Sequence, residues 1–461
     1  MGSRESKDQT TPADDYPHAS ILKGSAESDA VLVQQNGGMS SSHKLSIWTA
    51  MVFIVGEMAG SGVLALPRAI ENSGWIGLVV LVVSCAAVGW CGVLLARCWL
   101  IVEERFPEYQ DQCRDPYPSI GYEAFGRPGK IFVSICTNIT LIGVSIVFLL
   151  LAAENIQAVF AKVPALAFSP CFWMLIIAAV LNPFVWMGTP KDFWPIAVGA
   201  TVSTALACIL LLVAIGIDPE SQVPSKVHHD DISIVTFALS FGTILFSFGG
   251  AAAFPTIQHD MRQTGDFPKA LVLAFSILIA MYLPVSALGY SVLGSTLEDN
   301  ILSGLVKHAN WVYYVIQALI CLHLLFAFTI VINPPCQELE KLLKMPLHFT
   351  WKRAVIRTLC VAFVVFIAET VPHFGPIQSL IGGSTTTLLA IVLPCVFYLK
   401  LTSMENLGWP ERKAALHEKI FSVEIIIVGV IGGVVTTYSA IKTLADPTTM
   451  VPPCYINVTI G

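Results

Sequence analysis

The sequence predicts an all-α membrane protein that consists of two inverted five-helix repeats and an eleventh transmembrane helix. Three observations lead to this prediction. Of the 461 residues, 55% are apolar and only 13% are charged, about half the charged share of an ordinary soluble domain. Eleven apolar segments are long enough to cross a hydrocarbon core about 30 Å thick. The first and the sixth of these segments carry glycine clusters at corresponding positions.

The predicted spans begin after a polar stretch. Residues 1–44 lack an apolar run, so they are expected to form a disordered cytoplasmic tail. The spans are predicted at 46–66, 75–97, 131–153, 171–188, 194–217, 232–257, 268–294, 309–332, 352–372, 374–399 and 419–444. Four further parts follow the tail: transmembrane helices 1–5 (45–217), an extracellular loop (218–231), transmembrane helices 6–10 (232–399), and a C-terminal part with a cytoplasmic loop, helix 11 and a short extracellular tail (400–461).

Lysines and arginines predict the orientation of the spans, because cytoplasmic loops near spans are enriched in these residues. With the N-terminus inside, 20 of them fall in or beside inner loops and five in or beside outer loops. The N-terminus is therefore expected in the cytoplasm, and the C-terminus outside the cell or in an organelle lumen. The sequon Asn457-Val458-Thr459 then lies on the outer side, so Asn457 is a predicted glycosylation site.

Charge and cysteine patterns exclude several functions. The 26 lysines and arginines are outnumbered by 32 aspartates and glutamates, so nucleic-acid binding has no electrostatic support. No cysteine or histidine cluster has metal-ligand spacing, so neither a metal nor another cofactor is expected. Cys171 and Cys454 are the cysteines nearest the outer side, and whether they form a disulfide is left open by position alone. A monomer in a lipid bilayer is expected.

Glycines interrupt spans 1 and 6 at matching places. Gly56, Gly60 and Gly62 fall close together in span 1, and Gly249 and Gly250 precede a run of small residues in span 6. Each glycine in a helix interior costs about 1 kcal/mol relative to alanine, so the backbone is expected to open at both places. When the two clusters are aligned, Gly62 falls on Gly250, and spans 1–5 and spans 6–10 are nearly equal in length. Such halves in opposite orientations are typical of inverted-repeat transporters.

An open helix within a membrane must line a polar cavity or be buried in protein, because lipid cannot satisfy backbone hydrogen bonds. Free N–H groups at the half-helix N-terminus around residues 60–62 suit a carboxylate. Free carbonyl groups near residues 246–248 suit an ammonium group, so an amino acid would satisfy both breaks. The predicted substrate-binding residues are Gly56, Gly60, Ser61, Gly62, Phe246, Ser247, Phe248, Gly249 and Gly250. The alternative is close helix packing for the glycines and ordinary core packing for the two phenylalanines.

Two titratable side chains within the spans are candidates for ion coupling. Glu57 lies near the middle of span 1, where an ionised side chain costs at least about 2.5 kcal/mol, so it is a candidate proton carrier or counter-ion. His323 lies in span 8, and histidine commonly changes charge near neutral pH. Hydrogen bonding to neighbouring helices is the structural alternative for both.

Other charged groups have simpler interpretations. Arg357, near the inner end of span 9, is expected to snorkel or to pair at the interface. The outer-loop residues 228–231, two histidines followed by two aspartates, are expected to form a solvated face.

The run from Gly60 to Trp75, GSGVLALPRAIENSGW, resembles the first-helix signature of the amino acid/auxin permease family, part of the amino acid, polyamine and organocation transporter superfamily. Residues 153–157, AENIQ, are similar to the proton-coupled amino acid transporters, and residues 381–400 provide a further match in span 10. The resemblance covers residues 45 to about 444. It implies a LeuT-like fold, eleven spans and alternating-access symport of amino acids with H⁺ or Na⁺.

The resemblance suggests one further site residue, and it shows one position at which this chain differs from the family pattern. LeuT-like Na⁺ sites use hydroxyl groups of span 8, which suggests Thr329, although this hydroxyl could equally bond to its own helix. Members of the family commonly carry an uncharged residue where Glu57 stands. The substrate list of the family therefore does not transfer directly to this chain.

The resulting hypothesis is a symporter of small amino acids, coupled to H⁺ or Na⁺, in the plasma membrane or a lysosomal or endosomal membrane. The alternative is an amino-acid sensor with the same site and little net flux. An enzyme is not expected, because the sequence lacks HExxH and DxD motifs and a convincing acid pair.

Overall fold

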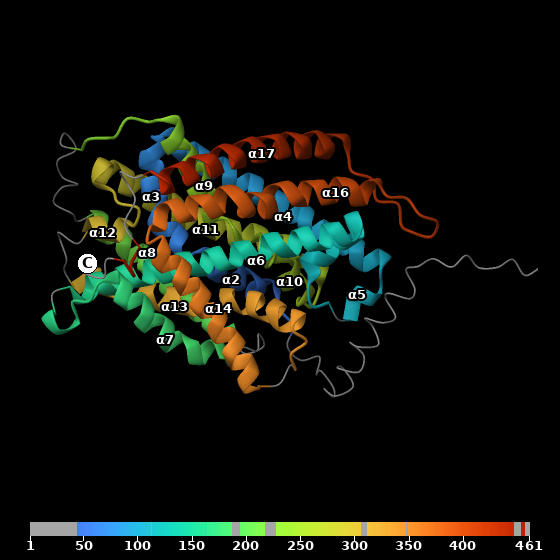
Figure 1. Ribbon diagram of the computed structural model, residues 1–461. Coiled ribbons are helices and arrows are strands. Elements are labelled where there is room, and N and C mark those ends of the chain that lie inside the picture. Colours follow the sequence, from blue (N-terminus) through green and yellow to red (C-terminus); the bar gives the residue numbers. More distant parts are fainter. Residues whose placement is uncertain are drawn as a thin grey trace, which may run out of the picture. The chain divides into compact units, whose positions relative to one another are not determined.

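The computed structural model describes residues 44–111, 113–161, 163–186, 194–216, 227–305, 311–346, 349–446 and 453–456. Their regular elements are helices (Figure 1), apart from an isolated parallel bridge between Leu45 and Met261. The predicted tail up to residue 43, part of the predicted loop 218–231 and the predicted glycosylation site Asn457 lie outside the described residues.

Each of the eleven predicted segments overlaps a described helix, and residues 187–188, 217 and 309–310 of these segments lie outside the described residues. The main helices are α2 (Ile47–Met58), α3 (Ser61–Ser73), α4 (Ile76–Arg105), α6 (Pro116–Phe160), α7 (Pro170–Trp186), α8 (Trp194–Gly216), α9 (Ile234–Ser247), α10 (Phe254–His259), α11 (Phe267–Leu293), α13 (Trp311–Leu342), α14 (Trp351–Thr370), α15 (Phe374–Ile381), α16 (Leu393–Ser403) and α17 (Leu416–Leu444). Within the described residues, eight helical segments are long and apolar enough to cross a membrane, or nine if α2 and α3 count as one bent span.

Short elements complete the bundle. They are α5 (Glu108–Asp111), α12 (Ile301–Gly304), and the 3₁₀ turns Pro164–Leu166, Gly250–Ala252, Thr264–Asp266 and Gly294–Thr296. Two π-helical turns, Gly382–Thr386 and Leu388–Val392, connect α15 to α16. Such turns are rare and often occur at functional sites.

The first span is broken where the glycine cluster predicts it. A capping box of Ser46 and Thr49 starts α2, and the helix ends at Met58. Gly60 then precedes α3, with φ −88° and ψ −104°, outside the helical region. The axes of α2 and α3 differ by 55°.

The second predicted break is milder. A capping box of Ser233 and Thr236 starts α9, which ends at Ser247. Phe248 and Gly249 leave the α-helix, a 3₁₀ turn follows at Gly250–Ala252, and α10 resumes at Phe254. The segment keeps its general direction and opens its hydrogen-bond ladder for about one turn.

The broken helices lie inside the bundle. α3 packs against α9, α11 packs against α2, α3 and α4, and α13 packs against α6 and α8. In Figure 1, α6, α16 and α17 run nearly parallel, and α14 crosses α6 obliquely. The outer helices therefore shield both breaks from lipid.

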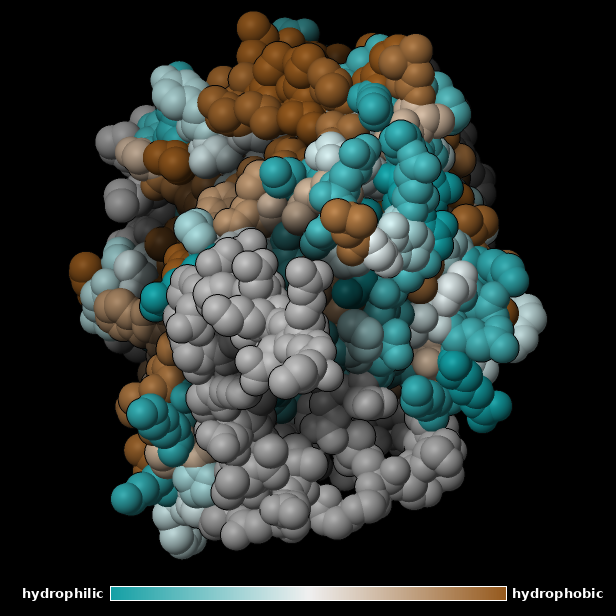
Figure 2. Space-filling model, turned by 90° about the vertical axis from the view of Figure 1, so that its right-hand side faces the viewer, coloured by the Kyte–Doolittle hydropathy of each residue, from teal (hydrophilic) through white to brown (hydrophobic). Residues whose placement is uncertain are grey.

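The surface has the distribution expected of a membrane protein. Large apolar side chains on the outer helices, including Val83, Val180, Leu359 and Ile431, are more than half exposed. Figure 2 views the end at which α5 lies, where hydrophilic residues face the viewer and hydrophobic residues gather at the upper rim. Exposed apolar sides with polar ends fit a lipid environment.

A disulfide joins Cys171, at the start of α7, to Cys454 in the segment 453–456, with Cα atoms 5.7 Å apart. The Cys454 N–H also donates to the Glu369 carbonyl at 2.9 Å. The pairing that the sequence left open is therefore present, and it lies at the end of the bundle that was predicted to face outward. Disulfides persist in oxidising compartments, which fits that side.

Candidate functional site

The N-terminus of α3 is an uncapped helix end inside the protein. No described side chain caps it, and its first turn carries Ser61 and Gly62, both buried. The first N–H groups of a helix have no intrahelical acceptor and share the positive end of the helix dipole. This end can therefore bind a carboxylate, as the sequence predicts for Gly60, Ser61 and Gly62.

The C-terminus of α9 presents carbonyl groups at the second break. The Phe246 carbonyl accepts the Gly249 N–H at 2.9 Å, and the Leu245 carbonyl accepts the Phe248 N–H at 3.2 Å. The Ser247 hydroxyl bonds back to the Thr243 carbonyl at 2.8 Å, so it does not project toward a ligand. The available polar groups at this break are therefore mainly carbonyl oxygens at the negative end of a helix dipole.

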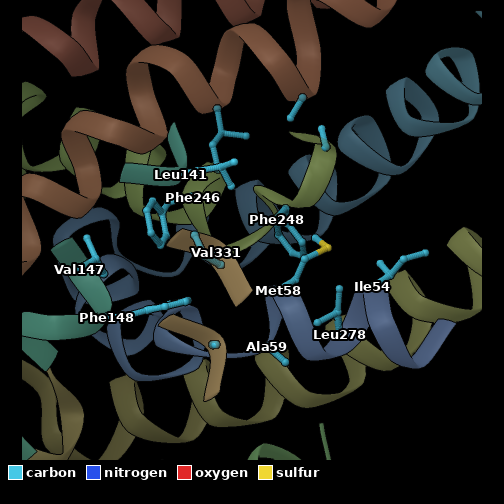
Figure 3. Close-up of a cluster of buried hydrophobic side chains, with 14 of the residues drawn as sticks. Ile54, Met58, Ala59, Leu141, Val147, Phe148, Phe246, Phe248, Leu278 and Val331 are labelled. Atoms are coloured by element: carbon cyan, nitrogen blue, oxygen red, sulfur yellow. The ribbon is translucent and has the colours of Figure 1, made fainter. Parts of the chain in front are cut away.

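The two breaks interlock. A Cβ on Gly62 would lie 2.7 Å from the Ser247 Cβ, and a Cβ on Gly250 would lie 2.7 Å from the Met58 Cγ. The start of α3 thus contacts the end of α9, and the end of α2 contacts the 3₁₀ turn after α9. Figure 3 shows the same proximity, with Met58 directed toward Phe248. The structure brings the two predicted halves of the site together.

Gly56 and Gly249 have packing roles. Gly56 lies within the helical part of α2, where a Cβ would lie 2.5 Å from the Thr201 hydroxyl of α8. Gly249 lies at the second break, where a Cβ would lie 2.9 Å from the Thr386 Cγ2. The Thr386 hydroxyl is buried and has no hydrogen-bond partner in the described part of the chain.

Tyr282 on α11 is a site residue that the sequence analysis missed. Its hydroxyl lies 2.8 Å from the Met58 carbonyl and 3.1 Å from the Ser247 carbonyl, the last residues of α2 and α9. Its position in the middle of a predicted span could have indicated this role, because a buried tyrosine hydroxyl usually has a hydrogen-bond partner.

His323 on α13 is fully buried against the first break. Its Nδ1 lies 3.0 Å from the Ala200 carbonyl and 2.8 Å from the Thr204 hydroxyl. Because a carbonyl can only accept, this geometry places the proton of a neutral ring on Nδ1. Nε2 has no partner among the described residues and lies where a side chain on Gly60 would stand. The ring therefore adjoins the predicted substrate site.

Glu57 and Thr329 have different surroundings. Glu57 lies one residue before the end of α2, is partly accessible, and its carboxylate makes no hydrogen bond in the described regions. Thr329 on α13 is buried, and its hydroxyl bonds to the Leu325 carbonyl of its own helix at 3.1 Å. In this conformation the Thr329 proton is directed to its own helix, while Glu57 is available to a proton or a cation.

The predicted solvated cluster at residues 228–231 is exposed, and two of its members also tether α3, which the sequence analysis did not predict. The buried carboxylate of Glu71 accepts hydrogen bonds from the His229 ring and from the Asp230 N–H, each at 2.8 Å. Arg68 pairs with Asp230 at 3.3 Å. We call Arg68, Glu71, His229 and Asp230 the outer clasp. The sequence analysis did not predict this cluster, because Glu71 lies far from residues 229 and 230 along the chain.

Asp299 lies in the loop after α11, near the outer clasp. Desolvation raises the pKa of the Asp299 carboxyl, and the charges of Arg68 and His373 and a backbone hydrogen bond from Gly375 oppose that rise. The end of the bundle that was predicted to face outward thus carries acidic and basic groups that influence one another.

Arg357 does not snorkel, contrary to one of the two expectations. It is fully buried, and its Nε donates to Glu340 at 2.6 Å. Arg353 reaches the same carboxylate at 2.8 Å, and Arg357 Nη1 donates to the Val185 carbonyl at 2.7 Å and to Asn333 at 3.0 Å. This network joins α7, α13 and α14. The expected pairing is present, but the pair is buried within the bundle.

The arrangement defines a class of protein: a helical membrane protein of LeuT-like fold with two broken helices at its centre. A search of solved structures supports the fold. The crystal structure of MhsT in complex with L-phenylalanine matches with a TM-score of 0.58 and 11% identity, covering 87% of this chain and 100% of that chain.

The chain belongs to the amino acid/auxin permease family, because the family profile described as "Transmembrane amino acid transporter protein" matches residues 43–442. Arabidopsis thaliana relatives include amino acid transporter AVT1C, 26% identical over 93% of this chain and 75% of the relative, and amino acid transporter AVT1B, 25% identical over 95% and 78%. Amino acid transporter ANT1 of the same plant is 26% identical over 84% and 90%. The family is one of transporters and not of enzymes.

Proposed function

We propose that the chain is a secondary active transporter that carries small amino acids by alternating access in symport with H⁺ or Na⁺. The observation that carries the proposal is the contact between the two breaks. The uncapped N-terminus of α3 meets the carbonyl end of α9, so opposite partial charges face one site. A zwitterionic amino acid has the complementary charges, and the named relatives are amino acid transporters.

The proposal includes the architecture of two inverted five-helix repeats and an eleventh helix. The positions of the breaks in α2–α3 and α9–α10 support it, because they start the two predicted halves. The proposed orientation has the N-terminus in the cytoplasm and the C-terminus outside or in a lumen. The disulfide between Cys171 and Cys454 supports that side assignment. The plasma membrane and lysosomal or endosomal membranes remain the two proposed locations.

For coupling we propose H⁺ ahead of Na⁺. Glu57 supports this choice, since it is an acid one turn from Gly60 without a described hydrogen-bond partner. His323 is the second candidate, because its Nε2 adjoins Gly60. Thr329 is the candidate ligand for Na⁺, for which its hydroxyl oxygen would use a remaining lone pair.

The test is uptake by proteoliposomes that contain the purified full chain. A panel of labelled amino acids is offered under an inward H⁺ gradient, an inward Na⁺ gradient, or no gradient. The proposal expects accumulation of at least one small amino acid under one gradient, and counterflow without any gradient. Binding without counterflow would instead indicate a sensor, and neither binding nor flux of any amino acid would contradict the proposal.

A further inference from the structure

We propose that Tyr282 is a positioning residue that holds the two broken helices in one register through a single shared hydroxyl group. The inference concerns the same site as the proposed transport function, and it rests on that function only for its kinetic consequence. Its structural consequence can be measured on protein that transports nothing.

The hydroxyl contacts both broken helices at their ends. It lies 2.8 Å from the Met58 carbonyl and 3.1 Å from the Ser247 carbonyl, both within hydrogen-bond distance. Met58 ends α2 in the first predicted half, and Ser247 ends α9 in the second. Tyr282 itself belongs to α11, which packs along α2 and α3. One atom of a third helix therefore connects two discontinuities that belong to different halves of the chain.

The tyrosine ring is fixed by its surroundings. It is fully buried, and its centroid lies 5.5 Å from the ring of Phe248, the residue that follows α9. Phe248 in turn stacks on Phe275 of α11 at 5.9 Å. Aromatic pairs at such distances stabilise one relative orientation. The hydroxyl is thus held at the breaks by packing as well as by its hydrogen bonds.

A phenol has one hydrogen to donate, but two carbonyl groups face it. Both carbonyls lie at helix C-termini, which carry partial negative charge and repel one another. The shared proton offsets that repulsion only while both ends stay close to it. If either helix end moves away, the hydroxyl donates to the remaining carbonyl alone, and the departed carbonyl loses its hydrogen-bond donor. The hydroxyl therefore couples the positions of the two breaks. A residue that only capped one helix end would not do so.

Tyr117 on α6 provides a matched control. It is buried, and its hydroxyl donates to the Leu389 carbonyl at 2.6 Å, so it bonds to neither Met58 nor Ser247, although the π turn that carries Leu389 packs against the 3₁₀ turn after α9. Tyr117→Phe and Tyr282→Phe each remove one buried phenol-to-carbonyl hydrogen bond and keep the ring. A general effect of such a loss would be equal in the two variants.

The first experiment measures amide hydrogen exchange of the full chain in lipid nanodiscs. Tyr282→Phe is expected to accelerate exchange about threefold to tenfold in both break segments, residues 57–62 and 247–252, because a buried hydrogen bond typically stabilises by this factor. Tyr117→Phe is expected to leave residues 57–62 unchanged, because its hydrogen bond does not reach the first break. Faster exchange in only one segment, or in neither, would overturn the coupling.

The second experiment separates KM from the maximal rate in proteoliposome uptake. Tyr282→Phe is expected to raise KM about threefold to tenfold, while Tyr117→Phe leaves KM within about twofold of the wild type. Equal changes in the two variants would reduce Tyr282 to a structural cap and overturn the proposal. If the wild type transports no amino acid, the proposed function fails, and the exchange experiment still decides the role of Tyr282.

Discussion

Gly62 shows how one absent side chain sets the geometry of the candidate site. A Cβ there would lie 2.7 Å from the Ser247 Cβ and 3.0 Å from the Ser247 Cα, which is backbone and cannot rotate away. Gly62→Ala is therefore expected to separate the two breaks and to lower amino acid uptake at least about tenfold. Surface biotinylation and size-exclusion chromatography would show that insertion and folding persist.

Gly89 on α4 is the control for that substitution. A Cβ there would lie 3.5 Å from the Phe275 ring, an ordinary contact, so Gly89→Ala is expected to transport normally. Normal uptake by Gly62→Ala would show that the contact between Gly62 and Ser247 is dispensable.

Glu57 is the residue at which the coupling ion can be tested. Glu57→Gln cannot release a proton, so it is expected to lose the stimulation of uptake by an inward H⁺ gradient and to retain counterflow. The measurement is initial uptake across a series of imposed pH gradients. Glu369→Gln, at the C-terminal end of α14, should behave like the wild type. A response of Glu57→Gln to the gradient equal to that of the wild type would remove Glu57 from the coupling mechanism.

Features of the candidate site were predictable from the sequence only where residue type directly affects the backbone conformation. Gly60 and Gly62 indicated the first break because glycine destabilises a helix wherever it occurs. Tyr282 and Glu71 were missed because their roles depend on partners in other helices and loops, far along the chain, which periodicity cannot reveal. The environment of His323 was likewise not predictable, since its ring nitrogens meet α8 on one side and Gly60 on the other.

At the scale of elements, hydropathy located the helices and misjudged their lengths. α6 continues to Phe160 beyond the predicted 153, and α13 continues to Leu342 beyond the predicted 332. The part of α6 before Gly126 is a separate helix, because the backbone at Gly126 is not helical (φ 70°, ψ −158°). The length of an apolar segment matches the thickness of the hydrocarbon core, whereas a helix can extend beyond that core into water as long as its backbone hydrogen bonds continue. The excess turns carry polar groups such as Glu340, and these build the ion-pair networks of the bundle ends.

The buried network around Arg357 makes a stability prediction for α7, α13 and α14. Arg357→Leu leaves the buried Glu340 carboxylate with Arg353 as its only arginine partner. We therefore expect the free energy of unfolding to fall by about 3 kcal/mol or more. Thermal unfolding in detergent would report it as a clear fall in Tm. Arg412→Leu breaks an exposed pair with Glu104 and is expected to cost less than about 1 kcal/mol. Equal Tm values for the two variants would contradict this assignment.

The outer clasp is an element-scale contact that was not predictable. Glu71 fixes residues 229 and 230 to the end of α3, the half-helix that follows the first break. Any movement of α3 in a transport cycle must therefore carry the loop before α9 with it or break these two hydrogen bonds.

At the scale of the whole molecule, the proposed orientation is testable by labelling individual cysteine side chains. Cys454→Ser frees Cys171, which is partly accessible at the end predicted to face outward, while Cys113 lies at the end predicted to face inward. A membrane-impermeant maleimide is expected to label Cys171 in sealed vesicles with the outer face exposed, and to label Cys113 only after permeabilisation. All variants also carry Cys360→Ser, because Cys360 is the other partly accessible free cysteine among the described residues, and adding Cys113→Ser then identifies the labelled residue. The opposite labelling pattern would show that the chain is oriented the other way in the membrane.

The disulfide has a further consequence for the chain as a covalent object. Because it connects Cys171 to Cys454 across a sequence separation of 283, the chain between them forms a closed ring that contains all of the second predicted repeat and helix α17. A single peptide-bond cut anywhere in this ring leaves both pieces attached, and only reduction releases them. The C-terminal helix is thereby secured to the α7 side of the protein by a bond as well as by packing.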